Sequence, residues 1–201
     1  MDLSSLTTLS DAAAENLSKH KGDLDLSGLT KLSDAAAERL SYLYPLKAAR
    51  GGYATLAILD LNGLKTLTGP AAKSFSKFKG ALYLNGLTTL SDIAAENLSM
   101  YSGDIKNPYA RGKLHLRGLV TLSDAAAESL SKYKGALHLD GLVTLSDAAA
   151  ESLSKHEEEE ELFLSGLTTL SDSSVKVLCN KRKIYLNDSI RGRFRQLHPR
   201  S

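Results

Sequence analysis

The stretch GLVTLSDAAAESLSK occupies Gly118–Lys132 and occurs again, letter for letter, at Gly141–Lys155. The Gly-Leu pair that begins it recurs at Gly28, Gly63 and Gly86, and once more at Gly166. Such self-similarity at a fixed spacing is the signature of a repeat architecture. An enzyme, by contrast, needs several different groups that converge on one point. The repetition therefore favours an array of similar structural units over a single catalytic centre.

Each unit joins two different hydrophobic periodicities. Its first part alternates, as in LDL, LYL, LHL and LFL, which is the period of a short strand with one buried face. Its second part has helical spacing, because Ala36, Ala37 and Leu40 of one unit fall on a single stripe. Glu38 and Arg39 point away from that stripe. A unit is thus predicted to be a strand, a turn and a short helix.

The aspartate of the LSD piece is expected to cap each helix. Asp34 is placed to accept hydrogen bonds from the first free backbone donors. In the one divergent unit Gly69 takes this position, and Pro70 follows where the first helical turn tolerates proline. We therefore assign a capping role, and no catalytic role, to the whole set of equivalent aspartates: Asp11, Asp34, Asp92, Asp124, Asp147 and Asp172.

The unit LDLSGLTKLSDAAAERLS resembles the cysteine-containing class of leucine-rich repeats. The residues that match are Leu24 and Leu26 of the strand, Leu32, Ser33 and Asp34 of the turn, and Leu40 and Ser41 at the helix end. The place where that family puts a hydrogen-bonding Cys or Asn is instead filled by leucine, at Leu29, Leu64, Leu87, Leu119, Leu142 and Leu167. An apolar column is expected to replace the family's polar ladder between neighbouring units.

The resemblance implies an α/β leucine-rich repeat solenoid, with parallel strands on the concave face and short helices on the convex face. About seven repeats and a terminal strand would occupy residues 1–186, and residues 187–201 would form a basic tail or a cap. Helical spacing of Ile190, Phe194 and Leu197 favours the cap. The segments around Pro45–Thr55 and Gly103–Gly112 are expected to lie outside the repeating core.

The residue between the two strand leucines should face outward on the concave side. That column reads Asp2, Asp25, Asp60, Tyr83, His115, His138, Phe163 and Tyr185. Rings on a preformed surface supply contact area with little rotamer entropy to lose. We therefore predict a site for a protein or peptide partner, formed by Tyr83, Asn85, His115, Arg117, His138, Asp140, Phe163 and Tyr185. The alternative is a stacked ladder that only stabilises neighbouring strands.

Other groups of residues are weaker candidates for a functional site. His115 and His138 are neighbours with Asp140 nearby and could form part of a metal site, but two imidazoles in line on a strand pair offer no obvious third ligand, so we expect neither a metal nor a cofactor. His20 and His156 fill a helix-end position that is apolar or aromatic elsewhere, and partial burial is expected for them. The run 157–161 of glutamates is predicted to be a solvated loop, or a docking patch for a basic partner.

Composition and charge limit the classes of function further. Apolar residues make up 42% of the chain and charged residues 24%, as in ordinary globular proteins, and the runs of apolar residues are too short to insert into a membrane. No phosphate-binding glycine loop or nucleophile motif is present, so we expect no enzymatic activity. Nucleic acid is not favoured as a partner, and a cytoplasmic location is favoured because no signal peptide is seen. The alternative to recognition is a scaffold that self-associates through its first strand.

Overall fold

The computed structural model describes residues 1–43, 57–103 and 113–197. Within them, seven strands form one parallel sheet in chain order, β1 to β7. The strands are β1 (Leu24–Asp25), β2 (Ile58–Asp60), β3 (Ala81–Tyr83), β4 (Leu114–His115), β5 (Leu137–His138), β6 (Leu162–Phe163) and β7 (Ile184–Tyr185). The helices are α1 (Asp11–Leu17), α2 (Asp34–Leu40), α3 (Gly69–Phe75), α4 (Asp92–Ser99), α5 (Asp124–Ser131), α6 (Asp147–Ser154), α7 (Asp172–Cys179) and α8 (Asp188–Leu197).

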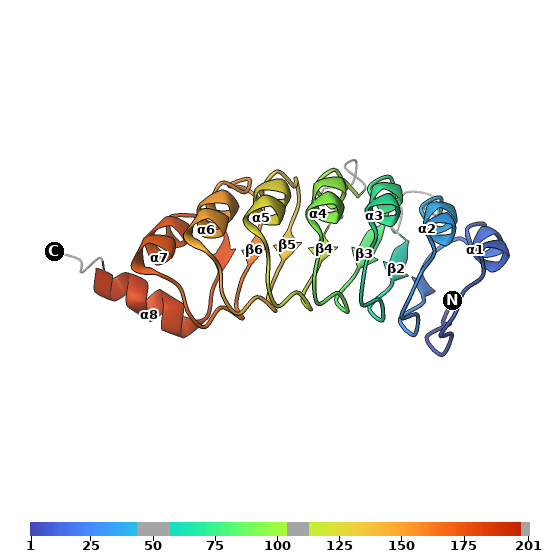
Figure 1. Ribbon diagram of the computed structural model, residues 1–201, viewed down its shortest axis with the longest axis horizontal. Coiled ribbons are helices and arrows are strands. Elements are labelled where there is room, and N and C mark those ends of the chain that lie inside the picture. Colours follow the sequence, from blue (N-terminus) through green and yellow to red (C-terminus); the bar gives the residue numbers. More distant parts are fainter. Residues whose placement is uncertain (44–56, 104–112, 198–201) are drawn as a thin grey trace, which may run out of the picture.

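Strands and helices alternate along the chain and form two separate layers. Each helix from α1 to α7 packs against the next one, while each strand pairs with the strand of the next unit. Figure 1 shows the result as an elongated molecule, with α1 to α7 in a row along one side and α8 below the end of that row. The fold is an α/β repeat solenoid, as the two periodicities of the unit predict.

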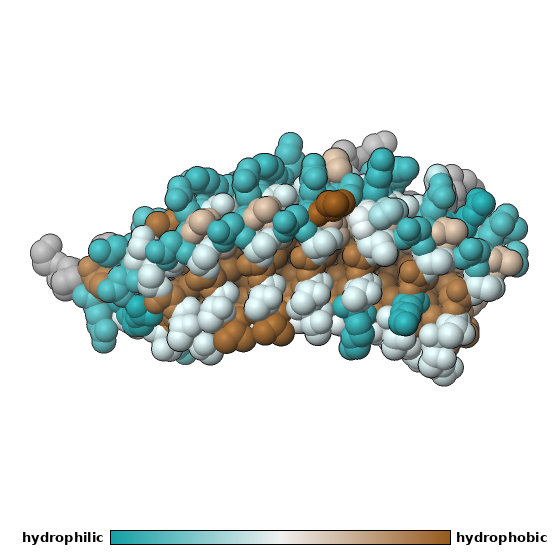
Figure 2. All heavy atoms as spheres, viewed as in Figure 1, coloured by the Kyte–Doolittle hydropathy of each residue, from teal (hydrophilic) through white to brown (hydrophobic). Residues whose placement is uncertain are grey.

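Leucine and alanine fill the space between the two layers. In the unit that contains α2, Ala36, Ala37 and Leu40 are completely buried, whereas Glu38 and Arg39 are exposed. Leu29 and its five equivalents are also completely buried, so the expected apolar column is confirmed. The leucine just before each helix cap is less well covered, as at Leu32 and Leu122. Figure 2 shows polar residues over the helix row and an apolar band running beneath it along the molecule.

The predicted capping residue is wrong by one position. From α1 to α7 the cap is the serine or threonine directly before the first helical residue, which is an aspartate except in α3: Ser33 Oγ, for example, accepts a hydrogen bond from the Ala36 backbone N–H (3.0 Å). Asp34 is the first helical residue, where its charge complements the positive end of the helix dipole. Sequence spacing alone allowed both residues, because serine and aspartate are equally good caps.

The aspartates instead link each unit to the next. Their carboxylates accept a hydrogen bond from the capping hydroxyl of the following helix, and we call this row of contacts the serine–aspartate ladder. Its contacts run from Ser33 to Asp11 (2.5 Å), Ser123 to Asp92 (2.5 Å) and Ser171 to Asp147 (2.5 Å), and also from Thr68 to Asp34 and Ser146 to Asp124. Where Gly69 replaces the aspartate, the Asn97 side-chain amide donates to the Gly69 carbonyl (3.2 Å).

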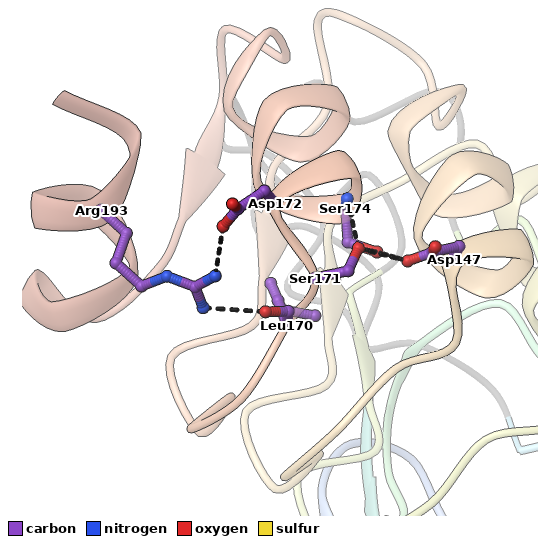
Figure 3. Close-up of polar contacts among 6 residues, drawn as sticks. All are labelled: Asp147, Leu170, Ser171, Asp172, Ser174 and Arg193. Carbon is purple, nitrogen blue, oxygen red and sulfur yellow. Dashed lines mark hydrogen bonds and ion pairs between the residues drawn. The ribbon is translucent and has the colours of Figure 1, made fainter. Parts of the chain in front are cut away.

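Helix α8 covers the last unit. Ile190 is completely buried, and Phe194 and Leu197 pack against the same core, which confirms their predicted helical spacing. Figure 3 shows how this helix ends the serine–aspartate ladder: Arg193 takes the place of the next serine and donates to the Asp172 carboxylate (2.6 Å) and the Leu170 carbonyl (2.8 Å). A solenoid end needs such a cover because it has no further unit to pack on.

A row of rings lies inside the molecule, at the helix ends. Tyr101 and Tyr133 stack with centroids 6.1 Å apart, and Tyr133 stacks on His156 at 6.4 Å. His156 is 1% exposed and its Nε2 contacts the Gly135 carbonyl (3.0 Å), while His20 is partly buried. Partial burial is thus confirmed for His20, and His156 is buried more completely than predicted. The predicted excursions Pro45–Thr55 and Gly103–Gly112 fall almost entirely outside the described residues.

Candidate functional site

The predicted column lies on the outer face of the sheet, in register from strand to strand. Asp2 pairs with Asp25 through an isolated bridge, and Asp25 pairs with Asp60. The rings then follow in order through the pairs Asp60–Tyr83, Tyr83–His115, His115–His138, His138–Phe163 and Phe163–Tyr185. A parallel register without slippage sets every member of the column on the same face. The side chains of the neighbouring leucines point into the core instead.

Four of the five rings form one continuous stack. The ring centroids are 4.3 Å apart for His115–His138, 4.1 Å for His138–Phe163 and 4.3 Å for Phe163–Tyr185, with planes within 9° of parallel. Tyr83 closes the row with its ring at 89° to His115 and 4.4 Å away. We call these five residues the ring ladder. Its spacing is close to the distance between strands, so the sheet itself imposes the stacking.

Stacking changes the expected exposure of the column. His115 is 9% exposed and His138 is 5% exposed, because the neighbouring rings cover both of their faces. Tyr83 and Phe163 are half-buried, and only Tyr185, at the end of the row, is exposed, at 42%. The rings face outward as predicted, but stacking leaves only the last of them freely exposed to solvent. What the middle of the ring ladder presents outward is ring edges rather than ring faces.

Burial also determines the protonation of the two histidines. Loss of solvent, with the charges of His138, Arg117 and Lys113 adding to it, lowers the pKa of His115 to about 3. Loss of solvent and Arg117 lower the pKa of His138, and Asp140 opposes this change. Both imidazoles are thus neutral at pH 7, which suits two rings in van der Waals contact.

Polar residues flank the ring ladder on one side. Arg117 is exposed and its guanidinium reaches two neighbours: Nη2 lies 3.1 Å from His138 Nδ1, and Nε lies 3.4 Å from Asp140 Oδ2. Its backbone N–H donates to Asn85 Oδ1 (3.1 Å). Asp140 also accepts from Ser165 Oγ (2.6 Å). The structure therefore brings Asn85, Arg117 and Asp140, which follow successive strands, together with His138 of β5.

Carboxylates border the Tyr83 end of the ring ladder. Asp2, Asp23, Asp25 and Asp60 line an open hollow of about 380 Å³, together with Tyr83. Burial raises the pKa of Asp60, and the charge of Asp25 adds to this effect, whereas hydrogen bonds from Asn62 oppose it. In residues 1–43, 57–103 and 113–197, no group of three or more histidine, cysteine or acidic side chains is arranged to hold a metal ion.

The glutamate run is more structured than a solvated loop. Glu160 is buried at 8% exposure, and the Glu159 carboxylate lies 3.4 Å from Lys183 Nζ. The Glu161 carboxylate accepts a hydrogen bond from the hydroxyl of Tyr185 (3.0 Å). Sequence reasoning missed these contacts, although one signal was present: the basic run 181–183 stands at the equivalent place of the next unit. The acidic and basic runs meet across neighbouring units.

These features define the class of protein: an α/β repeat solenoid whose sheet carries a ladder of stacked rings, with carboxylates at one end. No protein-family model matches the chain, and a search of curated proteins finds no significant match. None of the helices in the described part of the chain combines the length and the apolar character that a membrane span requires.

Proposed function

We propose that this chain is a leucine-rich-repeat recognition module that binds a protein or peptide partner on the outer face of its sheet and performs no catalysis. The leucine-rich-repeat assignment rests on the match of strand, turn and helix residues in the repeating units. The binding proposal rests on one observation, the ring ladder. Its rings are held by the sheet before any partner arrives, so binding would cost little side-chain entropy.

The charges around the ring ladder indicate how a partner would lie. The carboxylates of Asp25 and Asp60 stand at one end of the row, and Phe163 and Tyr185 stand at the other. An extended segment that crosses the strands would meet negative charge first and apolar edges last. We therefore expect a partner with basic residues at one end and aromatic or aliphatic residues at the other.

The ring ladder also stabilises neighbouring strands, so the test must separate binding from folding. Phe163 and Leu164 are adjacent in the chain and face opposite sides of the sheet: Phe163 is half-buried and Leu164 is completely buried. Peptides are first selected on the wild-type protein from a displayed random library. Their affinities are then measured for the wild type, for Phe163→Ala and for Leu164→Ala. Thermal melts of both variants give the stability scale.

We expect Phe163→Ala to weaken the selected peptides at least about tenfold while the protein stays folded. Leu164→Ala should cost about 2–5 kcal/mol of stability through its core cavity and leave the affinity of the folded fraction unchanged. Peptides that bind Phe163→Ala as well as they bind the wild type would show that the ring ladder is only structural packing.

One observation favours a second function, self-association at the first unit. The partly buried leucines there are Leu3, Leu6, Leu9 and Leu17, whereas the helix leucine of the next unit, Leu40, is completely buried. A second copy that covered them would form a dimer or a longer assembly. Light scattering over a range of concentrations distinguishes the two functions, because a recognition module stays monomeric and a scaffold gains mass.

A further inference from the structure

A cavity lies at the end of the core, where α8 replaces a further unit. It measures about 220 Å³ and its lining comes from α7, β7, α8 and the segments that join them: Cys179, Lys181, Arg182, Ile184, Leu186, Arg191, Phe194 and Arg195. The strand leucines of inner units, such as Leu162 and Leu164, are completely buried, but Ile184 and Leu186 keep 8% and 7% exposure. Helix α8 thus covers the last unit without filling all the space beside it.

The lining of this cavity divides into two halves. Ile184, Leu186 and Phe194 supply an apolar wall, and the half-buried Cys179 extends it. The other half carries four cationic side chains and includes no carboxylate: Lys181, Arg182, Arg191 and Arg195. Glu157, Glu158 and Glu160 act on Lys181 from outside the lining, so an anion would chiefly relieve the repulsion among the three arginines.

Two of the four cations are held in place by the fold. Lys181 Nζ donates to the carbonyls of His156 (3.1 Å) and Glu157 (2.8 Å), and the residue is almost completely buried. Arg191 donates from Nε to the Leu186 carbonyl (3.2 Å) and from Nη2 to the Ile184 carbonyl (2.9 Å). These bonds satisfy two backbone carbonyls at the outer edge of the sheet. Nη1 of Arg191 remains available to another acceptor.

The other two cations stand at the rim of the cavity. Arg182 has one long contact, 3.9 Å, with Glu159. Arg195 is exposed and forms no ion pair or hydrogen bond with any residue in the described part of the chain. Guanidinium groups bind carboxylates through two parallel hydrogen bonds, so two arginines at one rim suit a small oxyanion.

We propose that this cavity binds a small amphipathic carboxylate, with the carboxylate at Arg182, Arg191 and Arg195 and a short apolar chain or ring against Ile184, Leu186 and Phe194. The volume is below that of typical pockets for drug-sized ligands, so a chain of a few carbons fits better than a long lipid. The ring ladder is not involved, so this proposal does not depend on the function proposed above.

Cys179 provides a direct reporter because it is the only cysteine of the chain and lines the cavity. The probe is hexanoate, and the measurement is the rate at which iodoacetamide alkylates Cys179 at a fixed pH. We expect hexanoate to slow alkylation at least about tenfold at saturation. Hexanol lacks the charge and inorganic phosphate lacks the apolar part, so neither should protect the thiol at the same concentration.

The matched variants remove charge without disturbing the cap. In the double variant Arg182→Gln/Arg195→Gln, the bonds of Lys181, Arg191 and Arg193 to the backbone remain. We expect it to bind hexanoate at least about tenfold more weakly, as followed by shifts of the Ile184 and Leu186 methyl signals in NMR spectra, which also verify folding. The control Arg39→Gln, on the exposed face of α2, should bind as the wild type does.

A peptide that ends in a free leucine carboxylate identifies the source of the ligand. If it binds more tightly than hexanoate, and its amide does not bind, the natural ligand is the carboxyl end of a polypeptide; if hexanoate binds more tightly, it is a free acid. Equal protection of Cys179 by hexanoate, hexanol and phosphate would overturn the proposal. So would an unchanged affinity in the Arg182→Gln/Arg195→Gln variant, or no protection by hexanoate.

Discussion

Individual side chains in this protein perform two tasks at once, one within their own unit and one between units. Ser123 caps its own helix by accepting from the Ala126 N–H (3.0 Å), and it donates to Asp92 of the preceding unit (2.5 Å). His115 and His138 likewise belong to separate strands and bury each other by stacking. A substitution at such a position should therefore act on the interface between units as well as on one unit.

The buried histidines predict how stability depends on pH. Burial lowers the pKa values of His115, His138 and His156, so the unfolded chain takes up protons before the folded chain does. The free energy of unfolding should then be highest above about pH 6.5 and should fall as the pH is lowered from there toward the folded pKa values. Arg117 beside His138 and Lys181 beside His156 oppose protonation further.

Thermal melts between pH 7 and pH 5 measure this dependence. We expect the midpoint of the wild type to fall on acidification, and the midpoint of a His115→Phe/His138→Phe variant to fall less, because phenylalanine fills the same stack without titrating. If both proteins lost stability in parallel over this range, the histidines of the ring ladder would not be the cause.

At the scale of a single element, close approach between neighbouring turns explains the Gly-Leu pair. A Cβ at Gly141 would lie 2.1 Å from the carbonyl oxygen of Arg117 and 2.8 Å from that of Leu119. These atoms belong to the backbone of the preceding unit and cannot rotate away. Any side chain at this place must therefore push two units apart, whatever its polarity.

Two alanine substitutions test this reason for glycine. Gly141→Ala should lower the free energy of unfolding by about 1–3 kcal/mol or more, because of the backbone overlap. Gly192→Ala, inside α8, meets nothing within 4 Å and should raise it by about 0.5–1 kcal/mol through better helix propensity. Chemical denaturation measures both. An equal effect of the two substitutions would mean that conformational freedom, rather than close approach, selects glycine at position 141.

At the scale of the whole molecule, the helices and strands that pack closely in the described residues belong to neighbouring units. Stability is then close to a sum of terms from single units and from the interfaces between neighbours. The chain end at β7 depends on α8 for its cover. Arg193 completes the last contact of the serine–aspartate ladder, and Ile190 completes the core. Weakening this helix should therefore loosen the C-terminal units first and leave the N-terminal units as they are.

Ile190→Ala is the direct test of that expectation. Removal of this completely buried side chain should cost about 2–5 kcal/mol. Hydrogen exchange should then lose protection in α7 and β7, while α2 and β2 keep theirs. The exposed neighbour Gln196→Ala serves as the control and should leave exchange unchanged. Uniform loss of protection along the chain would show instead that the solenoid unfolds as one cooperative block.

The sequence by itself determines the repeat and its strand and helix parts. It also determines the apolar column at Leu29 and the order of the rings. Hydrophobic periodicity determines them, because a period of two and a helical stripe each bury one face only. The register of the column also follows, since identical units stack in identical register. For this reason the repeat pattern alone is enough to place the five residues of the ring ladder on one face of the sheet.

Three features depended on the tertiary structure. Ser33 rather than Asp34 caps its helix, because the aspartate is drawn to the hydroxyl of the next unit, which sequence spacing does not reveal. His138 is buried because rings on adjacent strands are close enough to cover each other. The basic cavity beside Cys179 exists only because α8 crosses the end of the core without filling it, and that geometry arises from the packing of whole elements rather than from any local pattern.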